Sequence, residues 1–289
     1  MDLAISTGAQ GLMWAILSLG VFLSFRILDV PDMTCEGSFP LGGAIAATMV
    51  VAGVSPWLAI AAAGVVAGAV TGILHTVFEI PAILAGILTM IALYSINLHI
   101  MGKANVSLLR TDTIFRLASR FLDCGSSVAA LVVSGGLILV LVLWVYWFFG
   151  TELGMCIRAT GFNVHMMRAQ GVNTDTMTIL GLLLSNGLIS ACGAVVAQNN
   201  GFADVGMGIG TLVIGLASII IGEVVLNATS FKTSLIAVMV GSVIYRVIIA
   251  VVLYMGMEPN DLKLFTAVVV VLALSMPLIK THIAAGREG

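Results

Sequence analysis

Long apolar segments alternate with short polar segments along the whole chain. A membrane-spanning helix needs about 20 mostly apolar residues. The segments that approach or reach this length are Ile5–Phe25, Phe39–Val54, Trp57–Phe78, Pro81–Met101, Val128–Phe149, Met177–Gln198, Met207–Leu226, Leu235–Met255 and Leu262–Ile279. The second is short, so eight full spans and one broken segment fit as well as nine spans. The pattern predicts an all-α, polytopic membrane helical bundle of about 8–9 transmembrane segments, with residues 1–289 forming one transmembrane domain.

The composition supports a membrane protein, because 60% of the residues are hydrophobic and only 9% are charged. A soluble domain has about 25% charged residues, whereas lipid accepts an apolar exterior. The net charge of −2 offers no basic surface for nucleic acid. The first apolar segment is long and is not preceded by a basic region, so we interpret it as a span and not as a cleavable signal peptide.

The lysines and arginines do not determine the orientation in the membrane. If the chain has nine spans and the loop around His165 is cytoplasmic, six basic residues lie inside and five lie outside, with Arg246 within a span. Most of the outside residues fall in Gly102–Ser127, where apolar residues from Ile114 to Leu122 alternate with Arg116 and Arg120. This spacing predicts an amphipathic helix in the membrane interface. Its arginines either bind lipid phosphates or a partner, or simply extend into water.

Two polar segments interrupt the apolar pattern. The first is Asp29–Gly43, DVPDMTCEGSFPLGG, in which Pro31 stops a helix and Pro40 can start the next one. The second is Gln198–Gly210, QNNGFADVGMGIG. Non-helical backbone at membrane depth is tolerated only where it is buried in protein or lines a wet cavity. Each segment is therefore either part of a translocation pathway or an ordinary surface loop. The candidate pathway residues are Asp29, Asp32, Glu36, Gln198, Asn199 and Asp204.

The two polar segments also suggest an internal symmetry. In the nine-span interpretation they lie on opposite sides of the membrane, and a helix rich in small residues follows each. Such an arrangement is typical of the inverted repeats of transporters. The sequence similarity between the two halves is weak.

Two further charged residues, Glu223 and Arg246, fall within apolar segments. Because an isolated charge in a membrane is costly, we expect them to form a structural ion pair. His75 and His99 are isolated on apolar segments, and the four cysteines have neither metal-ligand nor disulfide spacing. The chain contains no Walker A glycine loop, no Ser–His–Asp pattern and no HExxH motif. We therefore expect no metal, no cofactor and no enzyme activity in this chain.

A third polar segment, Arg158–Thr176, has the sequence RATGFNVHMMRAQGVNTDT. Asn163 can cap a short helix over Val164–Gln170, and Gly171 can end it. Thr174 or Asp175 can cap the apolar helix that follows. A short amphipathic helix of this kind either lies in a groove of a cytoplasmic partner or is a linker that contacts only lipid headgroups.

This third segment, together with LLLSNGLISACGAVVAQNNGFADVGMGIGTLVIGLASIIIGE farther along the chain, resembles the permease subunits of bacterial ABC importers. The resemblance is to the branched-chain amino acid and ribose type, and within it to the tryptophan and tyrosine import permeases. The earlier stretch LDVPDMTCEGSFPLGGAIAA resembles the first broken segment of the same subfamily. The resemblance covers nearly the whole chain. It is specific for the family and much less specific for the solute.

The resemblance implies that Ala159–Gly171 is a coupling segment that docks into a separate ATPase subunit. The expected coupling residues are Arg158, Ala159, Gly161, Asn163, His165, Met166, Arg168 and Gly171. It also implies an extracytoplasmic substrate-binding lipoprotein, a second permease copy in a homodimer, contact with membrane lipid, and a place in the bacterial cytoplasmic membrane. The alternative function is an ion-coupled secondary transporter or channel, in which the cation or proton sites would be Asp29, Asp32, Glu36, Asp204 or Glu223.

Overall fold

A computed structural model describes residues 2–62, 66–109, 111–227, 229–255, 264–265, 267–268 and 271. Within these residues, six helical segments are long and apolar enough to cross a membrane: Ala4–Ile27, Ala82–Met101, Ser126–Phe148, Thr174–Asn200, Val205–Leu226 and Phe231–Tyr254. The helix Cys35–Val51 is apolar but shorter. The prediction of a polytopic helical bundle is therefore confirmed, whereas most of the predicted segment Leu262–Ile279 lies outside the described residues.

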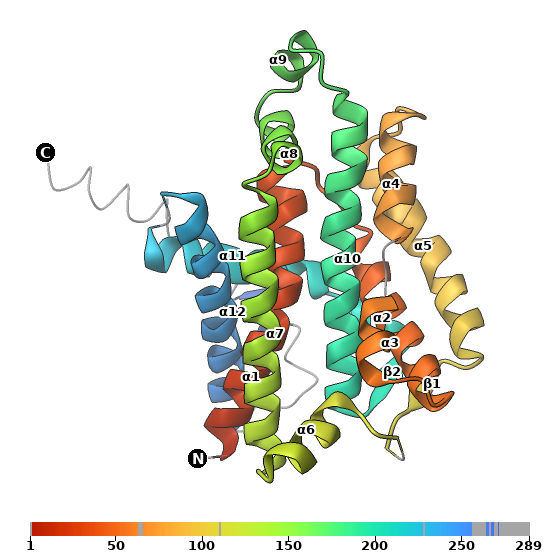
Figure 1. The fold of residues 1–289 in the computed structure, drawn as a ribbon, viewed down its shortest axis with the longest axis vertical. Helices are drawn as coiled ribbons and strands as arrows, with labels where there is room; N and C mark the ends of the chain where they lie inside the picture. Colours follow the sequence, from red (N-terminus) through yellow and green to blue (C-terminus); the bar gives the residue numbers. More distant parts are fainter. Residues whose placement is uncertain are drawn as a thin grey trace, which may run out of the picture.

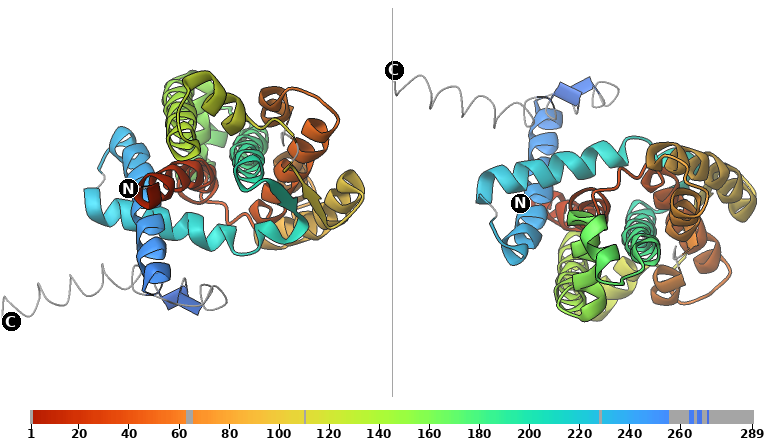
Figure 2. Two further views of the ribbon diagram at one scale, coloured as in Figure 1. Left: turned by 90° about the horizontal axis from the view of Figure 1, so that it is seen from below. Right: turned by 90° about the horizontal axis from the view of Figure 1, so that it is seen from above.

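The centre of the bundle is α1 (Asp2–Phe22), which continues as the π-helix η1 (Leu23–Ile27). It packs against α7 (Ser126–Phe148), α10 (Thr174–Asn200), α11 (Thr211–Leu226) and α12 (Phe231–Tyr254), as the end-on views in Figure 2 show. The second half of α1, from Leu12 onward, is apolar apart from Ser18, and most of its residues are buried. A helix that is apolar all round is expected at the core of a bundle.

A second group of helices packs on the other side of α10. It consists of α2 (Cys35–Val51), α3 (Pro56–Ala62), α4 (Val66–Thr76) and α5 (Ala82–Met101). Of these, α2 makes the most extensive contact with α10. The predicted segment Trp57–Phe78 corresponds to α3 and α4, and the residues between these two helices are not described.

The end of the bundle where the N-terminus lies carries two small elements (Figure 1). Strand β1 (Asn105–Ser107) pairs antiparallel with β2 (Phe202–Asp204), with Val106 opposite Ala203. This small sheet is an addition to the expected all-α fold, and it joins segments about a hundred residues apart. Helix α6 (Ile114–Leu122) lies across the same end, with Ile114 and Phe115 buried and its arginines exposed, as the amphipathic pattern predicts.

The opposite end of the bundle carries α8 (Glu152–Phe162) and α9 (Val164–Ala169), and α9 projects beyond the long helices (Figure 1). The basic side chains of Arg26, Arg158, Arg168 and Lys232 belong to elements that meet near this end. A 3-10 turn, η2 (Val205–Gly208), follows β2 and packs against α2. The first polar break follows η1 near the α8–α9 end of the bundle, and the second follows α10 at the opposite end (Figure 1).

Candidate functional site

The short helix α9 forms as the sequence predicts. The backbone of Asn163 is extended (φ −156°, ψ 97°), and its Oδ1 accepts a hydrogen bond from the backbone N–H of Met166 at 2.9 Å. This is the geometry of a helix N-cap. The helix ends at Ala169, one residue before the predicted end, and Gly171 follows with a φ of +81°, a left-handed conformation that favours glycine.

The start of the next helix differs from the prediction. Asn173, and not Thr174 or Asp175, caps α10, because its Oδ1 accepts hydrogen bonds from the N–H groups of Asp175 and Thr176, both at 3.1 Å. Thr174 and Asp175 are already in the first turn, and their side chains bind Arg168 instead. The Nε of Arg168 donates to the Thr174 hydroxyl at 2.8 Å, and its Nη2 lies 3.1 Å from the Asp175 carboxylate. Arg168 therefore attaches α9 to α10.

Helix α8 is seated on η1 at a point where only glycine fits. A Cβ atom at Gly161 would collide with the backbone carbonyl of Ile27. A cavity of about 670 Å³ opens beside this contact, and its lining includes Arg26, Asp29, Arg158 and Met166. Asp29, a predicted pathway residue, therefore lines the same cavity as predicted coupling residues, and none of the other pathway candidates lines it.

The surface of the α8–α9 end combines apolar and basic side chains. Phe162 is 91% exposed, and Met166 and His165 are exposed beside it. Met167 points inward and is buried. The guanidinium of Arg158 lies 4.5 Å from the centre of the Phe231 ring on α12. The segment thus presents an apolar tip on a base that contacts η1, α10 and α12.

The expected ion pair between Glu223 and Arg246 is not formed. Glu223 pairs with Arg26 instead, with 3.1 Å between Oε1 and Nε, and this pair joins α11 to η1 near the α8–α9 end. The Arg246 guanidinium lies 4.1 Å from the centre of the Trp14 ring, and its Nε has no hydrogen-bond partner among the described residues. A ring face stabilises this cation in place of a carboxylate, because α12 packs against the middle of α1 at this level.

A buried polar network holds the first break in place. Asp32 is 1% exposed, and its Oδ1 accepts a hydrogen bond from the N–H of Thr34 at 2.8 Å. Its Oδ2 accepts one from Nδ2 of Asn186 at 2.6 Å, and Oδ1 of Asn186 accepts one from the Ser38 hydroxyl at 2.7 Å. The break and the start of α2 are thereby attached to the middle of α10.

The network continues to two further helices. The Thr34 hydroxyl lies 2.6 Å from that of Thr71 on α4, which donates to that of Thr89 on α5 at 2.9 Å. Sequence reasoning missed Asn186 as a member of the site. The available signal was an amide side chain in the middle of an apolar span, which is a functional or structural marker in a membrane protein.

The two polar breaks start near opposite ends of the bundle but meet inside it. The Oε1 atom of Glu36, in the first turn of α2, accepts a hydrogen bond from the N–H of Gly210 at 3.0 Å. Gly210 is the N-cap of α11, directly after the second break. Asp204 shapes that break locally, because its Oδ1 accepts a hydrogen bond from the N–H of Gly206 at 2.7 Å. The start of α2 and the end of the second break are therefore joined directly by this hydrogen bond.

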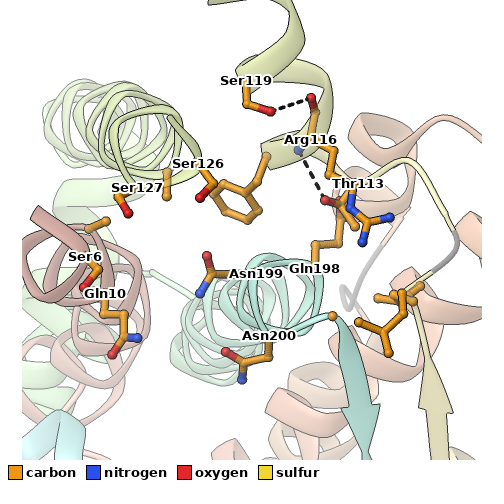
Figure 3. Close-up of a pocket in the computed structure, with 16 residues that line it drawn as sticks. Ser6, Gln10, Thr113, Arg116, Ser119, Ser126, Ser127, Gln198, Asn199 and Asn200 are labelled. Atoms are coloured by element: carbon orange, nitrogen blue, oxygen red, sulfur yellow. Dashed lines mark hydrogen bonds between the residues drawn. The ribbon is translucent and has the colours of Figure 1, made fainter. Parts of the chain in front are cut away.

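A polar cavity of about 320 Å³ opens at the end opposite α9, between α1, α6, α7 and α10 (Figure 3). Asn199 and Asn200 line it together with Gln10 and several serines. Gln198 also borders the cavity, but its amide is engaged elsewhere. Its Oε1 accepts a hydrogen bond from the N–H of Ile114 at 3.1 Å, and its Nε2 donates to the carbonyl of Pro56 at 3.3 Å. Gln198 therefore anchors α6 and α3, whereas Asn199 faces the cavity.

The candidate residues thus form three groups along the bundle. The coupling residues and Asp29 lie at the α8–α9 end, and Asn199 lies at the far end. Between the two ends lie the buried Asp32 and the partly exposed Glu36 with the glycine-rich turn. Within the described residues, no three His, Cys, Asp or Glu side chains come together in a group that could hold a metal ion.

Residues 4–275 match the family model described as branched-chain amino acid transport system, permease component. The chain is 40% identical over 274 residues to the tyrosine transport system permease protein of Clostridioides difficile (strain R20291), which covers 94% of this chain and 90% of that protein. It is 33% identical over 280 residues to the uncharacterized protein RP368 of Rickettsia prowazekii (strain Madrid E), covering 95% and 98% of the two chains.

A more distant relative is the galactofuranose transporter permease protein YtfT of Escherichia coli (strain K12). It is 27% identical over 267 residues, which cover 90% of this chain and 75% of that protein. No solved structure matches the chain.

Proposed function

The chain belongs to the family of branched-chain amino acid transport system permeases, and from this premise we propose that it is the translocation subunit of an ATP-driven importer of amino-acid-like solutes. As a family member it is a multi-pass protein of a bacterial inner membrane and the permease component of an ABC-type transport system. A separate ATPase supplies the energy, an extracytoplasmic binding protein delivers the solute, and a second permease copy completes the passage.

The α8–α9 end carries this proposal. Phe162 at the end of α8 and Met166 on the projecting α9 form an exposed apolar tip that suits a groove on a partner protein. Its base is held by the Gly161 contact with η1 and by the Arg168 bonds to α10. A displacement of α9 would therefore be passed to η1, which continues α1, and to α10, which carries Asn186 of the buried polar network. Mechanical coupling of this kind needs a rigid base and an exposed tip.

Aromatic amino acids are the solutes that we propose, because a relative that is 40% identical is named as a tyrosine transport permease. In this class of importer we expect the binding protein to make most of the selection. Exchanging the binding protein for one from a related system should therefore change the solute that is imported. If the selectivity stayed with the permease after the exchange, this expectation would be wrong.

The decisive test is reconstitution. The permease should co-purify with an ABC ATPase encoded beside it, and proteoliposomes that contain both should take up L-tyrosine only with ATP and binding protein. Flux driven by a sodium or proton gradient through the purified permease alone would contradict the proposal and support an ion-coupled transporter.

The orientation can be tested separately. Met166→Cys, in a background lacking the native cysteines, should react with a membrane-impermeant thiol reagent in inside-out vesicles but not in intact cells. A second variant that retains only the native Cys124, which is exposed at the opposite end of the bundle, serves as the control and should react only in intact cells. Labelling of Met166→Cys from outside would contradict both the orientation and the coupling role.

A further inference from the structure

A third cavity lies where the two polar breaks meet α5. Its volume is about 410 Å³, and its lining includes Glu36, Tyr94, Asn97, Val205 and Ile209. It opens on the side of α5 and the turn η2, where Tyr94 and Ile209 are exposed. Neither the coupling segment nor the polar cavity of Figure 3 shares any of these residues.

Glu36 is a carboxylate without a cationic partner in this cavity. None of the ion pairs within the described part of the chain includes it. Its Oε1 accepts the hydrogen bond from Gly210, and its Oε2 makes none with the residues that the structure describes. An ionised carboxylate has about four acceptor positions. Most of the acceptor capacity of Glu36 is thus available to a group that enters the cavity.

Asn97 adds a second unused acceptor. Its side chain is 1% exposed, and its Nδ2 donates to the carbonyl of Gly37 at 3.3 Å. Because a carbonyl can only accept a hydrogen bond, the amide nitrogen must face Gly37, and the amide oxygen is the free atom. This Oδ1 has no partner among the described residues. A buried acceptor without a partner is rare in native proteins and indicates a missing donor.

The remaining lining is apolar and aromatic. Met90, Ile91, Tyr94, Val205 and Ile209 surround the two acceptors. A lipid chain would leave both acceptors without a partner, because hydrocarbon offers no hydrogen-bond donor to a carboxylate or an amide oxygen. A solute that complements this lining carries a cationic or strongly donating head and an apolar body.

We propose that this cavity holds the ammonium group of an aromatic amino acid during its passage, with Glu36 as its counter-ion and Asn97 as its second acceptor. The proposal rests on the proposed import of amino acids. The ammonium group has three donors, and its bond to a carboxylate is charge-assisted and therefore among the stronger hydrogen bonds. Tyr94 and Met90 offer the aromatic side chain of the solute a ring and a polarisable thioether to pack against.

The test removes the negative charge of Glu36 while keeping the shape of its side chain. Glu36→Gln keeps the length of the side chain and an oxygen that can still accept the bond from Gly210, but it removes the charge. Glu79→Gln, at an exposed acid in the segment before α5, is the matched control. In proteoliposomes that contain permease, ATPase and binding protein, ATP-driven uptake of L-tyrosine should fall at least about ten-fold in Glu36→Gln and stay unchanged in Glu79→Gln. Glu36→Asp should retain more uptake than Glu36→Gln.

A competition experiment uses the unmodified permease, so its result does not depend on whether a variant folds. Tyramine keeps the ammonium group of tyrosine and lacks its carboxylate, whereas 3-(4-hydroxyphenyl)propanoate keeps the carboxylate and lacks the ammonium group. With each compound in excess on both sides of the membrane, tyramine should slow L-tyrosine uptake and the propanoate should not. The affinity of the isolated binding protein for both compounds is measured separately, so that competition at that protein is subtracted. Equal inhibition by the two compounds would overturn the proposal.

The outcomes separate this inference from the function on which it rests. If the unmodified complex shows no ATP-driven uptake of any amino acid, the proposed function fails. If it takes up L-tyrosine and Glu36→Gln does so at the same rate, only the ammonium site fails. If uptake requires a sodium gradient that Glu36→Gln no longer uses, the carboxylate binds an inorganic cation and the proposal is overturned.

Discussion

Asp32 and Asn186 lie 154 positions apart in the chain, and a hydrogen bond of 2.6 Å joins the carboxylate of the first to the amide nitrogen of the second. This bond attaches a non-helical break to the middle of a long apolar helix. Both groups are buried, so neither has water as an alternative partner. The position of the break inside the bundle depends on this pair.

Asp32→Asn should destabilise the permease. Asparagine presents one amide nitrogen, which must face either the N–H of Thr34 or Nδ2 of Asn186, and both are donors. A buried donor left without an acceptor costs about 1–3 kcal/mol of stability. Thermal unfolding of the purified protein should show a lower Tm. Asp29→Asn, the same change at an exposed acid, is the control and should leave the Tm nearly unchanged.

Arg168→Glu should uncouple the ATPase without preventing membrane insertion. The change replaces the bond to Asp175 with repulsion between two carboxylates and removes the donor to Thr174. The increase in ATPase activity that the permease causes in the assembled complex should fall several-fold. Arg120→Glu, which breaks an ion pair of the same 3.1 Å length with Asp112 at the opposite end, is the control.

Gly171→Val should also reduce the stimulation of the ATPase, although it changes no charge. Gly171→Val places a β-branched side chain at a φ of +81°, which such residues resist, so the exit from α9 should change. ATPase stimulation at the wild-type level in both Arg168→Glu and Gly171→Val would contradict the coupling role of α9.

Gln198 and Asn199 are neighbours that should respond differently to alanine. Gln198→Ala removes the acceptor for the Ile114 N–H and the donor to the Pro56 carbonyl, so we expect a loss of about 1–3 kcal/mol in stability and a lower Tm. Asn199→Ala, at the wall of the polar cavity, should leave the Tm nearly unchanged and alter solute uptake if the cavity belongs to the passage. A lower Tm in Asn199→Ala alone would contradict the assignment of these two roles.

The ion pair of Glu223 can be identified by double-mutant cycles. Arg26→Met and Glu223→Gln should couple, because their charged atoms lie 3.1 Å apart. The coupling energy should not exceed about 1 kcal/mol, since the Arg26 side chain is largely exposed to solvent. Arg246→Met and Glu223→Gln should be additive, since the guanidinium of Arg246 lies on the Trp14 ring. Measured coupling between Arg246 and Glu223 would contradict the structure.

Local chemistry alone determined several features. The apolar lengths predicted the long spans, because a membrane accepts only apolar segments whose backbone bonds are satisfied internally. The cap at Asn163 and the left-handed turn at Gly171 were predictable, because each depends on a residue and its nearest neighbours. The amphipathic helix at Ile114–Leu122 followed from its spacing in the same way. Even so, the choice of Asn173 over Thr174 and Asp175 as the cap was missed, because all three residue types can fill that position.

The tertiary structure alone decided which distant polar groups meet. The sequence identified Glu36 and the glycine-rich turn as two breaks, but the bond between Glu36 and Gly210 spans 174 positions and has no local signature. In the same way, Glu223 was expected to pair with Arg246 and instead pairs with Arg26. A charged or polar side chain in a membrane must find a partner, and the sequence shows that need. Which partner it finds depends on how the helices pack, because only packing brings two residues far apart in the chain within hydrogen-bonding distance.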